Sequence, residues 1–177
     1  TSPARNRIPN SPDSQFDLKP FRWYHIAVTF DHGTVAVYID GRLKVSQRAE
    51  VSASDGRTAL IDKVNFAIPH SDETDGKPRC FWIGHSYRLQ TDGDLFYERR
   101  FDGRMSEVRL WNRVLPADEI NAPNHFYKID PASEGLVAYW KFDDNTSGKS
   151  VRDYTSNGFD LKTEREVDWQ SVALPEE

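Results

Sequence analysis

The sequence lacks the features that mark several functional classes. It contains one cysteine, Cys80, so it predicts no intrachain disulfide and no cysteine-based metal site. No apolar run approaches the ~20 residues that a membrane-spanning helix needs, which argues against direct membrane insertion. Basic residues are in the minority, with 23 Lys and Arg against 28 Asp and Glu and a net charge of -5. A nucleic-acid partner is therefore not expected, because such proteins present a basic face.

Motifs for nucleotide, metal and nucleophilic chemistry are also missing. There is no glycine-rich phosphate loop and no dinucleotide-binding fingerprint. The five histidines are scattered, without the spacing of metal ligands. Cys80 lies within an apolar segment, where a buried and unreactive thiol is the expected state. The residues therefore favour neither a nucleotide-dependent enzyme nor a nucleophilic hydrolase.

What the sequence does contain is a series of short β-type segments. Hydrophobic residues make up 37% and aromatic residues 12% of 177 residues, as is typical of a single globular domain. Alternation of apolar and polar residues predicts the strands, and turn residues at 31–33 and 40–41 predict hairpins. The predicted strands cover residues 22–30, 34–39, 42–45, 59–68, 79–84, 101–111 (with a bulge or bend near Gly103) and 135–142, with short extended pieces at 151–154 and 159–161.

The segments between and before these strands are mostly polar. Residues 1–20 hold four prolines and are predicted to form a loop or tail, and residues 85–100 are predicted to form a long loop. One short helix is predicted from Pro116, which suits a first helical position, and Pro123 limits it to about two turns. Many short strands without βαβ alternation indicate an all-β, antiparallel sandwich with one short helix.

Three segments together resemble one family of domains. The first is the hairpin W-Y-H-I-A-V-T-F at 23–30 with V-Y-I-D-G at 37–41. The second is F-D-G-R-M-S-E-V-R-L-W-N-R-V-L at 101–115. The third is G-L-V-A-Y-W-K-F-D at 135–143, followed by V-R-D-Y-T-S-N-G at 151–158. These motifs resemble those of laminin-G-like, concanavalin A-like lectin/glucanase jelly-roll domains.

The resemblance carries expectations about fold, location and partners. It implies an antiparallel jelly-roll sandwich over residues 21–177. The arrangement resembles the C-terminal module of secreted gut-bacterial surface proteins linked to glycan utilisation. This implies a secreted or cell-surface location, on the bacterial outer surface or in the periplasm, and a polysaccharide or glycan as partner, together with other domains of the same protein. The third motif opens many family domains but lies late in this chain, so we expect either a fragment or a reduced sandwich that lacks N-terminal strands.

The predicted carbohydrate site lies between residues 85 and 100. Sugar-binding sites combine flat aromatic rings for pyranose faces with polar side chains for hydroxyl groups. This segment offers both kinds of side chain. The predicted site residues are His85, Tyr87, Arg88, Asp92, Asp94, Tyr97 and Arg99. The alternative is that the aromatic residues only fix the loop to the sandwich.

A structural calcium ion is a further expectation from the resemblance, since family members often carry one. Asp143, Asp153 and Asn157 lie in turns of the third segment and offer the oxygen ligands that calcium prefers. The alternative is Asx-turn hydrogen bonding, which needs no metal.

Catalysis is the least favoured function. Glucanases of this fold carry alternating carboxylates on one strand, in a run such as E-x-D-x-x-E, and this chain has no such run. Glu107 and Arg109 alternate on a predicted strand and are expected to pair on a sheet surface. The sequence therefore predicts a non-catalytic carbohydrate-binding module of an extracellular bacterial protein. The alternative is a structural or protein-interaction module of a cell-surface protein, and a glycoside hydrolase ranks third.

Overall fold

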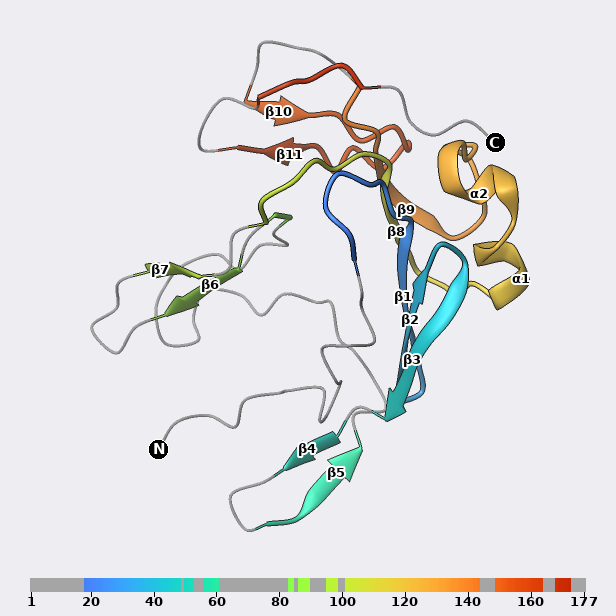
Figure 1. Ribbon diagram of the computed structural model, residues 1–177, viewed down its shortest axis with the longest axis vertical. Helices are drawn as coiled ribbons and strands as arrows, with labels where there is room; N and C mark the ends of the chain where they lie inside the picture. The colour runs from blue at the N-terminus through green and yellow to red at the C-terminus, as the bar shows by residue number, and fades with distance from the viewer. Residues whose placement is uncertain are drawn as a thin grey trace. The chain divides into compact units, whose positions relative to one another are not determined.

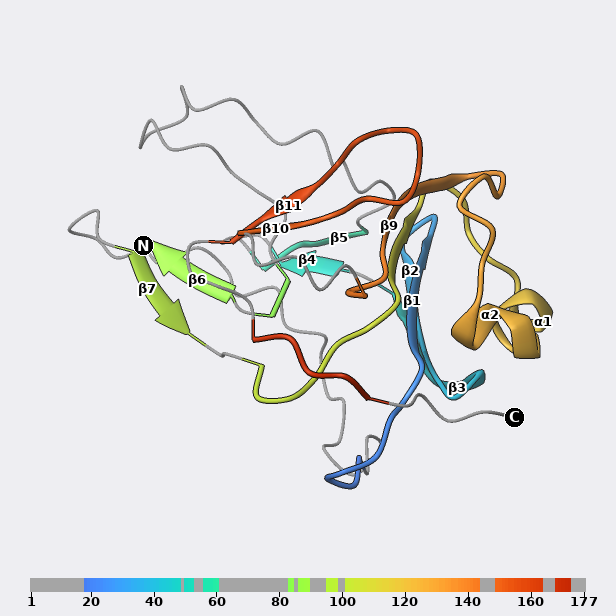
Figure 2. The same cartoon turned by 90° about the horizontal axis from the view of Figure 1, so that it is seen from above.

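The computed structural model describes residues 18–48, 50–52, 56–60, 83–84, 86–89, 95–98, 101–143, 149–163 and 168–172. By its internal contacts the chain divides into two compact units, Thr1–Lys63 with Ser106–Glu177, and Val64–Met105. Every strand pair among the described residues is antiparallel, as the two views in Figures 1 and 2 illustrate. The predicted all-β antiparallel class is confirmed.

A three-stranded sheet forms the first part of the larger unit. Its strands are β1 (Ile26–Asp31), β2 (Thr34–Ile39) and β3 (Arg42–Arg48), in the order β1-β2-β3. The predicted meander is confirmed, although β1 begins at Ile26 rather than at residue 22, and β3 continues three residues beyond the predicted end at Val45. The register of the β2–β3 ladder shifts between Val37 and Tyr38, as at a β-bulge, and beyond this shift the two strands stay paired up to Arg48.

Both hairpin turns have the backbone that a two-residue connection favours. The φ angles are 42° and 85° at His32 and Gly33, and 49° and 70° at Asp40 and Gly41. Positive φ at both central positions is the type I′ pattern, which matches the twist of the flanking strands. The second turn also packs closely on a helix end, since a Cβ at Gly41 would lie 2.1 Å from Oδ1 of Asn121.

One face of this sheet is apolar but unevenly covered. The register places Ile26 opposite Ile39, and Val28 opposite Val37, so these four residues share a face. Ile39 is only 6% exposed, whereas Ile26 and Val28 are 55% and 65% exposed. The core therefore covers β2, while the edge strand β1 presents apolar side chains to solvent.

Strand β9 (Leu136–Trp140), which pairs with β8 (Val108–Trp111), carries several of the most deeply buried side chains of the described core. Ala138, Tyr139 and Trp140 of β9 are each 3% exposed or less. The chain bends at Gly103, which confirms the bend that was the alternative to a bulge there. The ladder begins only at Val108, not at residue 101, and its register shift lies between Leu110 and Trp111, because the cross-strand partner, which the sequence does not reveal, decides where the register shifts.

The connection between β8 and β9 contains two short helices, α1 (Ala117–Ile120) and α2 (Pro123–Tyr127). The prediction of one helix is wrong, because Pro123 starts the second helix instead of only ending the first. Proline suits a first helical position, where its missing N–H removes no hydrogen bond. Ile120 is fully buried and fixes α1 to the core.

Short strand pairs complete the described elements. In the larger unit, β4 (Glu50–Ser52) pairs with β5 (Thr58–Leu60), and β10 (Ser150–Val151) pairs with β11 (Leu161–Lys162). Of the strand predicted at 59–68, the part beyond residue 60 lies outside the described residues, and so do residues 79–82 of the strand predicted at 79–84. Among the residues that the structure describes, no helix is long and apolar enough to cross a bilayer.

The described part of the smaller unit contains a hairpin, β6 (Ser86–Leu89) with β7 (Leu95–Glu98). The prediction of an unbroken loop over 85–100 is therefore wrong. The error has a physical cause, since four-residue strands are too short for clear alternation, and the charged and glycine residues between them dominate the pattern.

Candidate functional site

One buried carboxylate organises the turn at residues 153–160, which we name the Asp153 turn. Asp153 is 4% exposed. Its Oδ1 accepts hydrogen bonds from the backbone N–H groups of Tyr139 and Thr155, both at 2.9 Å. Its Oδ2 accepts from the Thr155 hydroxyl at 2.8 Å and from the Phe159 N–H at 2.9 Å. Four hydrogen bonds thereby close the turn and attach it to β9.

These hydrogen bonds also determine the charge state of the carboxyl group. Burial alone raises the pKa of Asp153, but the backbone N–H groups of Tyr139, Thr155 and Phe159 and the Thr155 hydroxyl outweigh it, so the pKa lies below its ordinary value. The carboxylate is consequently ionised at neutral pH and acts as an acceptor for its own turn.

The three residues predicted to bind calcium are each engaged in hydrogen bonds. Asp143 Oδ1 accepts from the Tyr154 hydroxyl at 2.7 Å, and Asn157 Nδ2 donates to the Val137 carbonyl at 2.8 Å. Asp153 makes the Asx-type contacts that the sequence offered as the alternative. Within the described ranges no group of three or more His, Cys, Asp or Glu side chains is arranged to hold a metal ion. The calcium site stays a prediction.

A buried ion pair lies beside the Asp153 turn. Arg109 Nη2 donates to Glu107 Oε2 at 2.6 Å, and the side chains are 5% and 15% exposed. The Tyr139 hydroxyl donates to the same oxygen, and Arg109 Nη1 donates to the His125 carbonyl at 2.5 Å. The predicted Glu–Arg pairing is confirmed, but its predicted place on the sheet surface is wrong, because Tyr139 and α2 cover it. Burial, followed by the hydrogen bond to Glu107, raises the pKa of Tyr139 to about 12.

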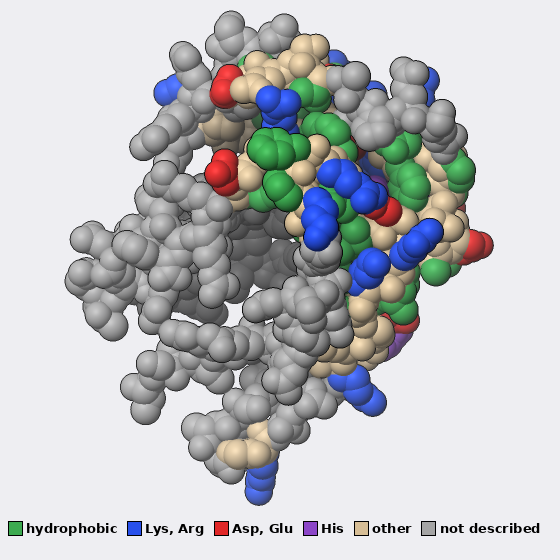
Figure 3. All heavy atoms as spheres, in the orientation of Figure 1, with side chains coloured by type: hydrophobic (Ala, Val, Ile, Leu, Met, Phe, Trp, Pro, Cys, Tyr) green, Lys and Arg blue, Asp and Glu red, His purple; other side chains and the backbone are tan. Residues whose placement is uncertain are grey.

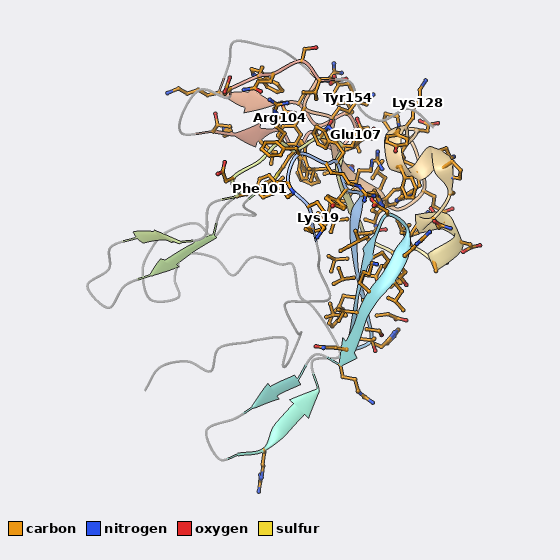
Figure 4. The ribbon with its side chains drawn as sticks, in the orientation of Figure 1. Lys19, Phe101, Arg104, Glu107, Lys128 and Tyr154 are labelled. Atoms are coloured by element: carbon orange, nitrogen blue, oxygen red, sulfur yellow. The ribbon has the colours of Figure 1, made fainter. Side chains whose placement is uncertain are left out.

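A cluster of two cations and two aromatic rings adjoins this ion pair. The rings of Tyr139 and Tyr154 are 6.3 Å apart. Lys141 Nζ lies 4.4 Å from the centre of the Tyr154 ring and 5.4 Å from that of Tyr139, and Arg152 Cζ lies 5.0 Å from the Tyr154 centre. We call Tyr139, Lys141, Arg152 and Tyr154 the Tyr154 cluster. Figure 4 labels Tyr154 and Glu107, and both approach Tyr139: its ring lies near that of Tyr154, and its hydroxyl donates to Glu107.

Sequence reasoning missed the Tyr154 cluster, although one signal pointed to it. Tyr139 and Lys141 are two residues apart within the strand predicted at 135–142, whose extended backbone would place them on the same face, although β9 itself ends at Trp140. The other two members, Arg152 and Tyr154, follow β10 in the chain, and only the fold brings them next to β9. In the upper half of the face drawn in Figure 3, Lys and Arg side chains lie next to hydrophobic ones.

The residues of the predicted carbohydrate site fall on and around the β6–β7 hairpin. Tyr87 and Tyr97 are direct cross-strand partners, and Arg88 is the partner of Phe96. His85, Asp92, Asp94 and Arg99 lie outside the described residues. The structure thus brings Tyr87 and Tyr97 together across the hairpin.

Two histidines that are 100 residues apart in the sequence meet in the larger unit. The rings of His25 and His125 are 5.5 Å apart, edge to face, and Nδ1 of each is buried without a hydrogen-bond partner. Burial, then the neighbouring His125 and Arg109, lower the pKa of His25 to about 4 against the opposing effect of Asp40. Burial and Arg109 also lower the pKa of His125. Both imidazoles are neutral at pH 7.

Comparison with known proteins gives two matches. A laminin G family model, described as the concanavalin A-like lectin/glucanases superfamily, matches residues 4–121. The chain is also similar to the crystal structure of a "putative carbohydrate binding protein" from Bacteroides ovatus, with 26% identity and a TM-score of 0.51. The similarity covers 84% of this chain and 38% of that one, so the chain spans well under half of its neighbour's length. No curated protein matches the sequence.

Proposed function

Because the chain belongs to the concanavalin A-like lectin/glucanase superfamily, we propose that it is a non-catalytic carbohydrate-binding module of an extracellular bacterial protein. The observation that carries this proposal is the similarity, at 26% identity over 84% of the chain, to the Bacteroides ovatus protein named for carbohydrate binding. That neighbour is much longer, which supports a module acting beside other domains.

The proposed sugar platform is the β6–β7 hairpin. Tyr87 and Tyr97 stand opposite one another in the register, and two adjacent aromatic residues suit the apolar face of a pyranose. His85, Arg88, Asp92, Asp94 and Arg99 are proposed to bind the hydroxyl groups. The register adds the pairing of the two tyrosines to what the sequence alone suggested.

The non-catalytic part of the proposal rests on the carboxylate next to β8. Glu107 Oε2 accepts hydrogen bonds from Arg109 and Tyr139 and is largely buried. A general acid or nucleophile needs access to the glycosidic oxygen or the anomeric carbon. Glu107 is instead placed to stabilise the fold.

The test is affinity electrophoresis of the folded chain in gels that contain a panel of polysaccharides. We expect one or more polysaccharides to retard the wild type. A Tyr87→Ala, Tyr97→Ala double variant is expected to bind the polysaccharide about tenfold more weakly, since aromatic ring contacts contribute about 0.5–1.5 kcal/mol each. The matched control is Phe96→Ala, which removes an aromatic ring from β7 at a position that is not among the predicted site residues.

The same gels separate the alternatives. Equal losses in the tyrosine double variant and in Phe96→Ala would show that the hairpin acts only through its stability. Release of reducing ends from a retarding polysaccharide would overturn the non-catalytic assignment. Runs with calcium and with a chelator test the predicted metal site, because chelator-sensitive retardation would place an ion at or near the sugar.

A second candidate function is a structural or protein-interaction module. The observation that favours it is the edge strand β1, where Ile26 and Val28 are more than half exposed. Exposed apolar residues on a sheet edge are typical of surfaces that contact another protein segment. Absence of retardation by every polysaccharide, from a chain shown to be folded by circular dichroism, would favour this function over the first.

A further inference from the structure

Phe101 presents an aromatic ring to solvent next to the segment that carries the predicted sugar site. The residue is 53% exposed, although phenylalanine is among the residue types that are most often buried. Its backbone N–H donates to the Gly84 carbonyl at 2.7 Å, and this hydrogen bond joins the residues directly before and after segment 85–100. Phe101 and the β6–β7 hairpin therefore belong to the same compact unit, and the hydrogen bond fixes Phe101 where that segment begins and ends.

The far end of the Phe101 ring packs against Gly103. A Cβ built at Gly103 would lie 2.7 Å from Cζ and 2.9 Å from Cε1 of Phe101, which is closer than van der Waals contact. The φ of Gly103 lies outside the left-handed region, so the backbone conformation does not itself require glycine there. The glycine instead makes room for the ring, which is thus held at both ends while more than half of the residue stays exposed.

Two polar side chains accompany the ring. Asp102 and Arg104 are exposed, and neither side chain has a hydrogen bond or an ion pair with another described residue. A carboxylate accepts and a guanidinium donates hydrogen bonds, so together they supply both kinds of partner that a sugar hydroxyl needs. The stretch 101–104, in which Figure 4 labels Phe101 and Arg104, therefore combines a flat apolar ring with available donors and acceptors, as binding sites for small ligands do.

The length of the chain limits how far this ring lies from the proposed sugar platform. Tyr97 and Phe101 are four residues apart, and four residues span at most about 14 Å. Gly84, which is bonded to Phe101, is three residues from Tyr87, a span of at most about 11 Å. A glycan chain that contacts the two tyrosines therefore has a third aromatic ring within reach.

We propose that Phe101 forms a second aromatic subsite, which stacks on a pyranose ring of the polysaccharide that the β6–β7 hairpin binds. The inference deepens the proposed function and rests on it. The ring supplies a flat apolar surface for the C–H face of the sugar, and its support by Gly103 reduces the conformational entropy that is lost on binding. Asp102 and Arg104 bind hydroxyl groups at this subsite. The ligand is consequently an extended stretch of a pyranose polymer.

The experiment is affinity electrophoresis of the folded chain in gels that contain soluble starch, dextran, xylan or galactomannan, all of them chains of pyranose rings. Phe101→Ala is expected to bind the retarding polymer roughly twofold to tenfold more weakly, as the loss of one aromatic contact does. Phe101→Leu keeps an apolar side chain but removes the flat ring, so we expect it to weaken binding by a similar factor.

Gly103→Ala tests the position of the ring rather than its presence. The added methyl group must displace the far end of the Phe101 ring, which belongs to a movable side chain and not to the backbone. The variant is therefore expected to unfold at the wild-type temperature and yet to bind the retarding polymer roughly twofold to tenfold more weakly. Thermal unfolding of every variant shows whether the fold is intact.

The matched control is Phe159→Ala. Phe159 is 54% exposed, against 53% for Phe101, so both variants remove an equally exposed ring. Phe159 belongs to the larger unit, and its removal is expected to leave retardation unchanged.

Each outcome supports or overturns the inference. Equal retardation of the wild type and of Phe101→Leu overturns the second subsite and leaves the proposed function standing. Equal weakening by Phe101→Ala and Phe159→Ala overturns it as well, because the effect is then not specific to position 101. If Gly103→Ala binds like the wild type while the Phe101 variants unfold at a lower temperature, Phe101 has a structural role and the subsite is overturned. No retardation by any polymer overturns the proposed function and this inference together.

Discussion

The Asp153 turn and the edge strand β1 differ in which kind of side chain they bury: the turn buries a charged group, and the strand exposes apolar ones. Asp153 is a charged group that is 4% exposed, and all four of its hydrogen bonds come from the protein. Val28 is an apolar group that is 65% exposed. Residue polarity therefore does not decide which side chains stabilise this fold. A buried carboxylate stabilises one region, whereas exposed apolar residues contribute little to the stability of the other.

The physical reason is what each side chain leaves behind when it is removed. When a buried acceptor is lost, its donors remain buried and unpaired, which costs about 1–3 kcal/mol for each group. When an exposed methyl group is lost, water has already been in contact with it, and little burial is lost.

Removal of the Asp153 carboxylate is expected to have the largest effect. Asp153→Ala leaves the N–H groups of Tyr139, Thr155 and Phe159 without their acceptor, and we expect a loss of about 4 kcal/mol or more in the free energy of unfolding. Urea denaturation measures this loss. Asp153→Asn keeps the shape and one acceptor and is expected to lose less. A loss below about 1 kcal/mol for Asp153→Ala would show that the hydrogen bonds of the Asp153 turn contribute little to the stability of the fold.

The buried ion pair should show the next largest effect. Glu107→Gln leaves the Arg109 guanidinium, which is 5% exposed, without its counter-charge, and we expect a loss of about 3 kcal/mol. The matched control is Glu119→Gln, which breaks the pair of Glu119 with Arg113, whose side chains are 33% and 35% exposed. A half-exposed pair contributes about 0–1 kcal/mol. Equal losses in the two variants would show that burial does not determine how much these ion pairs contribute to the free energy of unfolding.

The histidine pair predicts a dependence of stability on pH. The pKa of His25 is about 4 in the folded chain, below the ordinary 6.5 of an unfolded histidine, so the unfolded chain takes up protons first as the pH falls. Stability is therefore full above pH 6.5 and declines between pH 6.5 and about 4. We expect this decline to be on the order of 1 kcal/mol after allowance for the partial exposure of the ring.

Urea denaturation at several pH values checks the decline. His25→Gln is expected to flatten the profile in this window. His32→Gln is the control, because the His32 side chain is 92% exposed and its pairing with Asp31 lies on the surface. A profile that keeps its slope in His25→Gln would assign the decline to other groups, with His125 the first to test.

The smallest effect on stability is expected at β1. Val28→Thr keeps a β-branched side chain on the edge strand and removes one exposed methyl group, so we expect a change within about 0.5 kcal/mol. Light scattering during heating is the more sensitive measurement, because a less apolar edge should aggregate at a higher temperature. A loss above about 1.5 kcal/mol would mean that Val28 is covered in solution.

Local signals in the sequence were enough to predict the first sheet. The alternation at 34–39 and the Asp40-Gly41 turn fix β2 and its hairpin without help from the rest of the chain. The β6–β7 hairpin was missed because its strands have only four residues each. The sequence predicts that Pro123 ends a helix, whereas Pro123 is the first residue of α2. A proline that cannot continue one helix is well suited to the first position of the next.

The parts of the candidate site that the sequence did not reveal depend on distant contacts. Asp153 looks like a calcium ligand in isolation, and only the position of β9 shows that Tyr139 donates to it. The meeting of His25 with His125 and the stacking of Lys141 on Tyr154 likewise join segments that no local pattern relates. The sequence predicts the pairing of Glu107 with Arg109 from strand alternation, and the pair forms, but Glu107 precedes β8 with a φ of 58°, and neither this backbone nor the burial of the pair follows from a local pattern.

The close packing of the β2–β3 turn on α1 constrains how this sequence can change over evolutionary time. A side chain at Gly41 would meet Asn121 at 2.1 Å, and the φ of 70° would strain it further. A smaller residue at 121 removes the contacts with Oδ1 and Cγ, but the Cα of residue 121 would still lie 3.0 Å away and the positive φ would still cost roughly 1 kcal/mol for most side chains. Substitution at 41 is therefore less costly after a change at 121 than before it, so epistasis between the two positions favours one order of mutations in descendants of this chain.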